Sequence, residues 1–293
     1  MSRSAGVTFM RGAAWLAAVL VPGAVFALIG YLLWRGLPAL GPDLFFGRTP
    51  PREALLGLRP VWDGIWPACA GTLCLVGLTL CLAVFPGVGC GLYLSEYATA
   101  AQKRRIGLAV DLLAGMPSIV MGLFGFSLIL LLRRTLAPDA NTCLALAAGC
   151  LALLVLPVLV AATREAADAV PRSLRLGAAA LGLTPAQRLR HVVLPAAARG
   201  IFSGVVLALG RAAEDTAVIM FTGVVANAGL PAGLAGKFET LSFHVYYTAA
   251  QYQDQAELAR GFGAAVVLLA LSGGLLALAR LLESGYRRRW RKG

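Results

Sequence analysis

Six long apolar stretches constrain the fold of this chain more than any other feature of its sequence. They cover residues 13–34, 65–94, 106–132, 142–162, 196–225 and 261–282. Each reaches the length of about 20 mostly apolar residues that a helix needs to cross the hydrocarbon core of a bilayer. The sequence therefore predicts an all-α integral membrane protein with six transmembrane helices.

The overall composition agrees with a membrane protein. Hydrophobic residues make up 59% of the chain and charged residues only 14%, whereas soluble domains carry about 25% charged residues. The net charge of +12 lies in short loops beside apolar runs, so it indicates membrane topology and not a nucleic-acid partner. The six Cys form no CxxC pair and the two His lie far apart, so we expect no metal site.

The distribution of basic residues predicts the orientation in the membrane. Of the 26 Lys and Arg, 17 lie at the N-terminus, in the loops 95–105 and 163–200, and at the C-terminal end. Because short cytoplasmic loops are rich in Lys and Arg, we expect both termini and these two loops to be cytoplasmic. The first apolar stretch is longer than the core of a signal peptide, which favours a retained anchor.

The basic segment from Arg164 to Gly200 is the longest loop on the predicted cytoplasmic side. A loop this long usually has a function of its own. Ser173 is a reasonable N-cap for a first helix that Gly182 ends, and Thr184-Pro185 predicts the start of a second helix through His191. Leu194-Pro195 is expected to turn the chain into the fifth span.

Charged residues also occur inside the fifth apolar stretch. A charge at the centre of a membrane helix costs about 2.5–3.5 kcal/mol on insertion scales. Arg211 and Asp215 are four residues apart and are expected to share a helix face, with Glu214 beside them. Two interpretations remain open: a self-paired cluster that fixes helix packing, and a gate or transit site at which the fork of Arg211 binds an anion. In the third stretch, Pro117 predicts a kinked helix.

The basic segment resembles the cytoplasmic coupling loop of bacterial ABC-importer permeases, on which an ATPase subunit acts. Gly182 is followed by nine residues, Val192, one residue and Leu194-Pro195, which is similar to the second half of that family's motif. Its Glu-Ala-Ala slot falls on Leu176-Gly177-Ala178, so the acidic residue is missing here. The resemblance implies coupling to the ATPase through Arg175, Leu176, Gly177, Ala178, Gly182, Leu194 and Pro195, with Arg172 a second candidate for a charged contact.

Other segments resemble the phosphate ABC-transporter permeases, and among them the PstA type. The segments are 87–98 (GVGCGLYLSEYA), 111–120 (DLLAGMPSIV), 122–125 (GLFG) and 209–217 (LGRAAEDTA). The last one departs from the family: Asp215 takes the position of the family's Glu, and Glu214 replaces a Gly. This resemblance implies the type I ABC-importer permease fold, in three parts: an anchor helix with an outer loop (1–64), a permease core (65–284) that contains the loop 163–200, and a basic cytoplasmic tail (285–293).

The same resemblance implies a function. The chain is expected to be the permease subunit of an ATP-driven importer of inorganic phosphate in the bacterial cytoplasmic (inner) membrane, and not an enzyme. It implies a substrate path through Arg211, Glu214, Asp215, Thr216, Pro117 and Ser118. The implied partners are a homologous second permease, two ATPase subunits that carry the ATP and Mg, an external phosphate-binding protein, and membrane lipid. We expect no cofactor on this chain itself, since it has no Gly-Lys-Thr or Gly-Lys-Ser phosphate-binding loop.

Two alternatives stay open at this point. The first is a permease for another oxyanion or solute, which would share the coupling loop but not the phosphate-type segments. The second is an ion-coupled secondary carrier, which works without an ATPase and often contains inverted repeats. Competition between solutes distinguishes the first alternative, and a search for an associated ATPase distinguishes the second.

Overall fold

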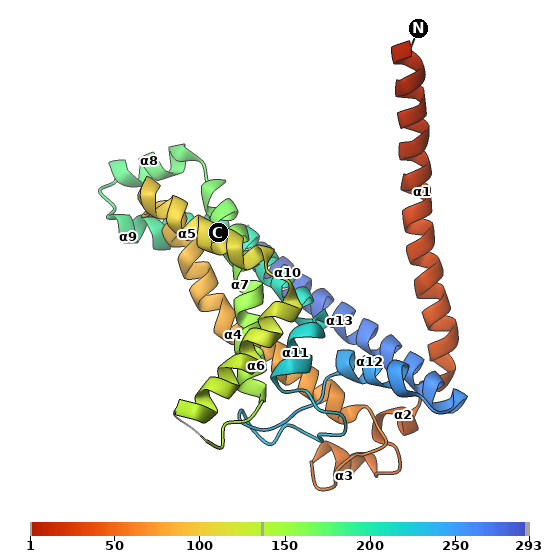
Figure 1. Cartoon of the computed structure of the whole chain (residues 1–293). Helices are drawn as coiled ribbons and strands as arrows, with labels where there is room; N and C mark the ends of the chain where they lie inside the picture. Colours follow the sequence, from red (N-terminus) through yellow and green to blue (C-terminus); the bar gives the residue numbers. More distant parts are fainter. Residues whose placement is uncertain (1, 136–137, 291–293) are drawn as a thin grey trace.

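The chain is folded almost entirely into helices, and six of its segments are long and apolar enough to cross a membrane. The computed structural model describes residues 2–135 and 138–290 (Figure 1). The helices are α1 (Ser2–Gly36), α2 (Pro42–Phe46), α3 (Pro51–Leu55), α4 (Trp66–Glu96), α5 (Ala100–Gly115), α6 (Ser118–Thr135), α7 (Leu144–Asp168), α8 (Arg172–Ala180), α9 (Pro185–Arg188), α10 (Leu194–Glu214), α11 (Ala217–Thr222), α12 (Leu241–Gln251) and α13 (Gln255–Trp290). The candidate spans lie in α1, α4, α6, α7, α9–α10 and α13, which confirms the predicted number of six.

The prediction of one kinked helix over residues 106–132 is wrong, because two separate helices, α5 and α6, cover this stretch. The helix α5 ends at Gly115, and Met116 has extended backbone angles (φ −73°, ψ 129°). The residue before a proline is driven out of the helical region by the proline ring, which explains the break at this point. The carbonyl of Pro117 then accepts a hydrogen bond from the N–H of Val120 at 3.0 Å and starts α6.

The predicted fifth span is also interrupted. The helix α10 ends at Glu214, and Asp215 is extended (φ −73°, ψ 117°). The Asp215 carboxylate accepts a hydrogen bond from the N–H of Val218 at 2.9 Å, so it satisfies one of the free N–H groups at the start of α11. The prediction that Arg211 and Asp215 share one continuous helix is therefore wrong.

The centre of the molecule is a packed group of α4, α7 and α10. Glycines let these helices approach closely, as small residues do in membrane proteins generally. A Cβ atom added at Gly91 of α4 would lie 2.6 Å from the Cβ of Thr163 and 2.8 Å from the carbonyl oxygen of Val160 on α7. A Cβ atom at Gly204 of α10 would lie 2.6 Å from the Cβ of Ala162. The helix α7 thus packs closely against both α4 and α10.

We expect Gly91→Leu to destabilise the protein, because the added side chain would overlap both a side chain and a backbone carbonyl of α7. Overpacking of this kind typically costs about 1–3 kcal/mol. The measurement is the apparent Tm of the purified protein in detergent. Gly89→Leu, two residues away on the same helix, is the matched control because no atom of the described residues lies within 4 Å of a Cβ atom there. An equal Tm for the two variants would contradict the α4–α7 packing.

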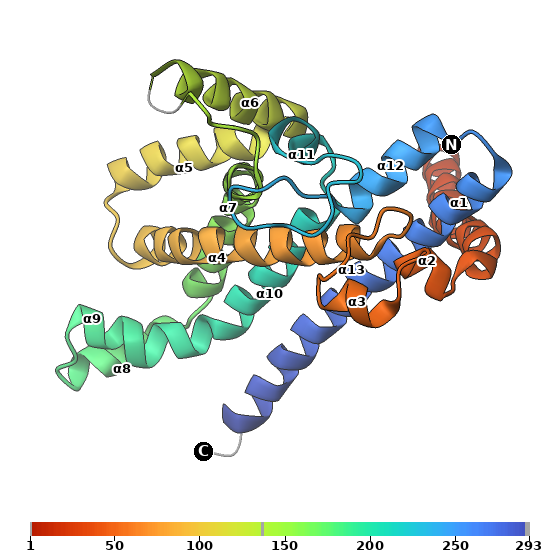
Figure 2. The same cartoon turned by 90° about the horizontal axis from the view of Figure 1, so that it is seen from below.

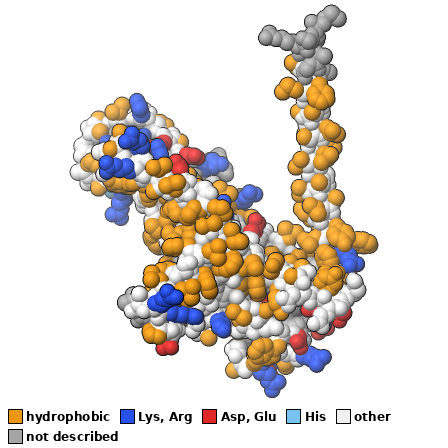
Figure 3. All heavy atoms as spheres, viewed as in Figure 1, with side chains coloured by type: hydrophobic (Ala, Val, Ile, Leu, Met, Phe, Trp, Pro, Cys, Tyr) orange, Lys and Arg blue, Asp and Glu red, His pale blue; other side chains and the backbone are white. Residues whose placement is uncertain are grey.

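Charged side chains lie at the two ends of the molecule, and an apolar belt lies between them. The belt and the basic end over α8 and α9 are visible in Figure 3. The start of α1, the α8–α9 pair and the last part of α13 lie in the upper half of Figure 1, whereas α2, α3 and the segment 226–240 lie in the lower half. The helix α13 continues through Trp290, and residues 291–293 of the predicted tail lie outside the described residues.

The helix α1 stands apart from the other helices over most of its length (Figures 1 and 2). Near its C-terminal end it packs on α13, where Tyr31 contacts Phe262 edge to face at 5.9 Å and Arg35 lies over the same ring. A Cβ atom at Gly36 would overlap the carbonyl oxygen of Phe262. The remaining apolar surface of α1 is exposed in the isolated chain, so lipid or another subunit must cover it in the membrane.

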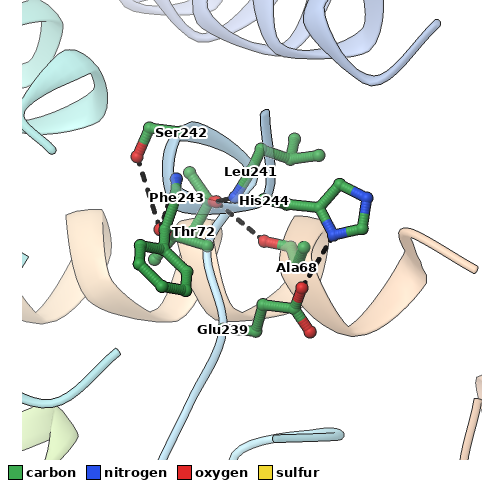
Figure 4. A network of polar contacts seen from close by, with 8 residues as sticks. Ala68, Thr72, Glu239, Leu241, Ser242, Phe243 and His244 are labelled. Carbon is green, nitrogen blue, oxygen red and sulfur yellow. Dashed lines mark hydrogen bonds and ion pairs between the residues drawn. The ribbon is translucent and has the colours of Figure 1, made fainter. Parts of the chain in front are cut away.

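A polar network fixes the segment before α12 onto α4 at the lower end of Figure 1 (Figure 4). The Thr72 hydroxyl donates to the carbonyl of Ala68 at 2.7 Å and accepts from the N–H of Leu241 at 2.9 Å. Beside it, Nδ1 of His244 lies 2.8 Å from Oε1 of Glu239, a carboxylate side chain only 6% exposed. These contacts give the long segment between α11 and α12 a defined position.

Candidate functional site

A groove with three charged side chains lies between α7, α10 and α13. Its volume is about 680 Å³. Apolar residues form most of its walls, and its polar groups are Ser203, Arg211 and Glu214 of α10 and Arg280 of α13. The net formal charge of these groups is positive, as an anion site requires.

The two arginines of the groove, one on α10 and one on α13, lie at different heights along the groove. A Cβ atom at Gly210 would lie 3.5 Å from Cδ2 of Leu276, which places these two residues side by side. Since α13 runs antiparallel to α10, Arg280 lies about one turn beyond Leu276 in the direction of the α8–α9 end. The groove thus carries Arg211 and Glu214 near one end and Arg280 toward the other.

The charged groups of the groove are not engaged with each other. In the described part of the chain, no ion pair within 4.0 Å joins Arg211 or Arg280 to Glu214 or Asp215. The structure therefore does not support the self-paired cluster that the sequence left open. Both guanidinium groups are available to a ligand, and Arg280 was missed by sequence reasoning because it had been counted with the terminal basic residues.

The other predicted path residues lie elsewhere. Asp215 and Thr216 form the link between α10 and α11, outside the groove lining. Pro117 precedes α6 and Ser118 is its first residue. The helix α6 packs on α11, because a Cβ atom at Gly122 would lie 3.0 Å from the carbonyl oxygen of Ala217. The six predicted path residues thus separate into a groove set, Arg211 and Glu214, and a set around the α6–α11 contact.

The predicted coupling segment forms two short helices that project from the body of the molecule, on the opposite side from α1 (Figures 1 and 2). The helix α8 begins at Arg172, one residue before the predicted start, and its N-cap is Pro171 and not Ser173. Gly182 has φ +77°, a conformation that glycine adopts without strain. Thr184 and Gln187 form a reciprocal capping box at the start of α9, which confirms the predicted second helix.

The prediction for Leu194-Pro195 is wrong, because the chain does not turn there. The segment from Pro185 to Glu214 is continuously helical and includes a π-helical turn, Leu189–Val193. The N–H of Leu194 bonds to the carbonyl of Leu189, five residues back. Proline has no N–H and its ring crowds the preceding turn, and a π turn at this point accommodates it. The second coupling helix is thereby continuous with α10.

The predicted coupling residues divide into an exposed set and an internal set. Leu176 is 70% exposed and the neighbouring Leu181 is 83% exposed, while Gly177, Gly182 and Leu194 are also exposed. Ala178 is buried, and Pro195 is half-buried. Large apolar side chains this exposed, outside the apolar belt, indicate a protein contact surface.

Arg175 belongs to the internal set. Its Nη2 atom lies 2.8 Å from Oε1 of Glu96 and donates to the carbonyl of Ala167 at 2.6 Å. Arg172 on the same helix is exposed. Of the two arginines that the resemblance offered for a charged contact with another subunit, Arg172 is the one on the surface of α8.

Comparison with known proteins places the chain among transport permeases. It is 31% identical to the phosphate transport system permease protein PstC of Mesorhizobium japonicum, over 74% of this chain and 70% of that protein. It is 32% identical to the PstA of Haemophilus influenzae, over 82% and 81% of the two chains. It is 35% identical to PstA 1 of Mycobacterium tuberculosis strain H37Rv, over 77% and 72%. Relatives of both permease types thus match at similar identity.

Solved structures show the same fold. The chain superposes on a chain of the MetNI methionine ABC transporter in an inward-facing conformation with a TM-score of 0.58 at 19% identity, over 81% of this chain and 99% of that one. A bacterial ABC transporter involved in the import of alginate gives a TM-score of 0.55 at 14% identity, over 92% and 98%. The fold is therefore that of type I ABC-importer permeases. Residues 87–288 match the family of binding-protein-dependent transport system inner membrane components, and the chain belongs to this family.

Proposed function

We propose that this chain is a transmembrane permease subunit of an ATP-driven importer of inorganic phosphate in the bacterial inner membrane. The observation that carries the proposal is the groove in which Arg211 and Arg280 form no ion pair with any residue that the structure describes. The phosphate transport permeases to which the chain is 31–35% identical support the choice of phosphate. The positive charge of the groove supports an anion in particular.

The chemistry of the groove suits the passage of an oxyanion. The planar guanidinium of Arg211 can donate two parallel charge-assisted hydrogen bonds to a tetrahedral oxyanion. Glu214, which lines the same groove, repels a doubly charged anion and so limits how long the anion stays. Arg280, further along α13, offers a second set of donors toward the α8–α9 end. Together they form a path of alternating attraction and repulsion along one side of α10.

The surfaces of the chain support a set of partners for this importer. A phosphate-binding protein would dock at the end formed by α2, α3 and the segment 226–240, which faces outward, while both termini and the α8–α9 pair face the cytoplasm. Two ATPase subunits carry ATP and Mg, and one of them contacts the exposed surface around Leu176 and Leu181. A homologous second permease completes the path, and the exposed apolar surface of α1 contacts that subunit or lipid. This chain binds no cofactor of its own.

Purification of the chain from its native membrane in mild detergent, followed by mass identification of bound proteins, tests this assignment. We expect an ATPase subunit and a second permease to co-purify in fixed ratio. A chain that purifies alone or only with itself, at every salt concentration, would contradict the assignment and favour a secondary carrier.

We expect Arg280→Gln to raise the KM for phosphate uptake at least about tenfold, because a hydrogen bond to a charged group contributes about 1.5–3 kcal/mol. The measurement is the initial rate of ATP-driven phosphate uptake against external phosphate concentration. Arg104→Gln, an exposed arginine on α5, is the control and should leave the KM unchanged. An unchanged KM in Arg280→Gln would exclude Arg280 from the path.

A further inference from the structure

Arg175 joins the first coupling helix to the ends of the two central helices. Its Nη2 atom contacts both Oε1 of Glu96, at 2.8 Å, and the carbonyl oxygen of Ala167, at 2.6 Å. Glu96 is the last residue of α4, and Ala167 lies in the last turn of α7. One guanidinium group on α8 therefore holds the C-terminal ends of both helices.

The environment makes this contact stronger than a surface ion pair. The Glu96 side chain is 8% exposed and that of Arg175 is 23% exposed, so water screens the pair weakly. The carbonyls at a helix C-terminus lack partners within their own helix and favour a positive charge. Arg175 supplies that charge to α7, and it neutralises a carboxylate at the C-terminus of α4, where the helix dipole disfavours an anion.

A second set of contacts joins α4 to α7 and to α5 at the same level. The Ser95 hydroxyl donates to Oδ1 of Asp168 at 2.5 Å, and the Lys103 ammonium donates to the carbonyl of Ser95 at 3.5 Å. The Ser95–Asp168 hydrogen bond thus joins the end of α4 to the end of α7 without α8, and Lys103 attaches α5 to the same end of α4. The Arg175–Glu96 pair adds the coupling helix to this unit.

We infer that Arg175 and Glu96 are a positioning pair that transmits movement of α8 to α4 and α7. This inference rests on the proposed function, in which an ATPase moves the α8–α9 pair. The second coupling helix is continuous with α10 through the π turn. The first one is joined to α7 through residues 169–171 and to α9 through Gly182 and its neighbours, and its lateral link to α4 is the Arg175–Glu96 pair. Here that link is internal and ionic, whereas the slot for the motif's acidic residue holds the exposed Leu176.

The test uses the complex of this chain with its second permease and ATPase, reconstituted in proteoliposomes, and measures phosphate uptake and ATP hydrolysis in the same sample. We expect Arg175→Gln and Glu96→Gln to retain hydrolysis and to lower the phosphate taken up per ATP about tenfold or more. The exchange of the two charges, Glu96→Arg with Arg175→Glu, is expected to recover much of this ratio. A purely structural role would lower both activities in parallel and leave the ratio unchanged.

Arg164→Gln is the matched control, because Arg164 forms an exposed ion pair with Asp168 at 3.6 Å on α7, and such pairs contribute little. Its ratio of phosphate taken up to ATP hydrolysed should equal that of the wild type.

An unchanged ratio in Arg175→Gln and Glu96→Gln overturns the inference. A charge-exchange variant that assembles but does not recover the ratio also overturns it. Arg175→Lys keeps the charge and should assemble even if Arg175→Gln does not; its failure to assemble would make the pair a folding element and also overturn the inference. Wild-type vesicles without ATP-driven uptake would instead refute the proposed function.

Discussion

Replacing Arg211 with alanine is expected to abolish ATP-driven phosphate uptake while the transport complex still assembles. Arg211 lines the groove between α7, α10 and α13, and within the described part of the chain it forms no ion pair. The substitution removes two parallel charge-assisted hydrogen bonds to the anion, and together these contribute about 3 kcal/mol or more. That corresponds to a loss of uptake of roughly 100-fold or more. The measurement is radiolabelled phosphate uptake, with the amount of assembled complex determined on the same preparation.

The conservative substitution Arg211→Lys separates charge from shape. Lysine keeps the positive charge but lacks the planar fork, so we expect partial uptake with a raised KM. The exposed Arg104→Gln should transport normally. Normal uptake by Arg211→Ala, with normal assembly, would show that the groove does not carry the anion.

Placing a charge on the exposed surface of the coupling helices should release the ATPase. Leu181 is 83% exposed and Leu176 is 70% exposed at the end of the molecule that carries α8 and α9. If these side chains are buried against an ATPase subunit, Leu181→Asp buries an unpaired carboxylate in that contact. The loss of a central apolar anchor costs about 2 kcal/mol or more, so we expect roughly 30-fold less ATPase to co-purify with the variant.

A matched substitution at the opposite end serves as the control. Leu58 is 70% exposed in the loop after α3, and Leu58→Asp should leave the ATPase bound. The double variant Leu176→Asp with Leu181→Asp should lose both the ATPase and phosphate uptake. Full ATPase binding by the double variant would place the contact surface elsewhere on the chain.

Local patterns in the sequence predicted much of the fold. The number of spans follows from apolar length, and the start of α9 follows from Thr184, Pro185 and Gln187, which lie next to each other in the chain. These features depend on neighbouring residues, so a single sequence contains them. The exposed position of the coupling segment follows in the same way from its polar composition between two apolar runs.

The errors arose where one local rule competed with another. The apolar pattern continues through Pro117 and through Asp215, so hydropathy alone predicted unbroken spans. At Pro117 the steric restriction on Met116 ended the helix, and at Asp215 a short polar side chain capped a new helix instead of continuing the old one. At Pro195 the error was of the opposite kind. A turn was expected there, but the helix continues because the preceding π turn accommodates the proline.

The site contains contacts that no single sequence indicates. Arg175 and Glu96 are far apart in the chain, and only the packing of α8 against the ends of α4 and α7 brings them together. The position of Arg280 in the groove was missed for a related reason. Its basic side chain also fits the charge pattern of the C-terminal segment, so charge alone did not indicate that it faces α10. The spacing of Leu276 and Arg280, which places both on one face of a helix, was a signal that could have indicated the groove.

The most direct test of the account is phosphate uptake by proteoliposomes that contain the purified complex with its binding protein, measured with and without ATP. We expect uptake that requires ATP, that excess unlabelled phosphate or arsenate inhibits, and that collapse of ion gradients leaves intact. Uptake that proceeds without ATP and stops when the ion gradients collapse would contradict the assignment as an ATP-driven phosphate permease.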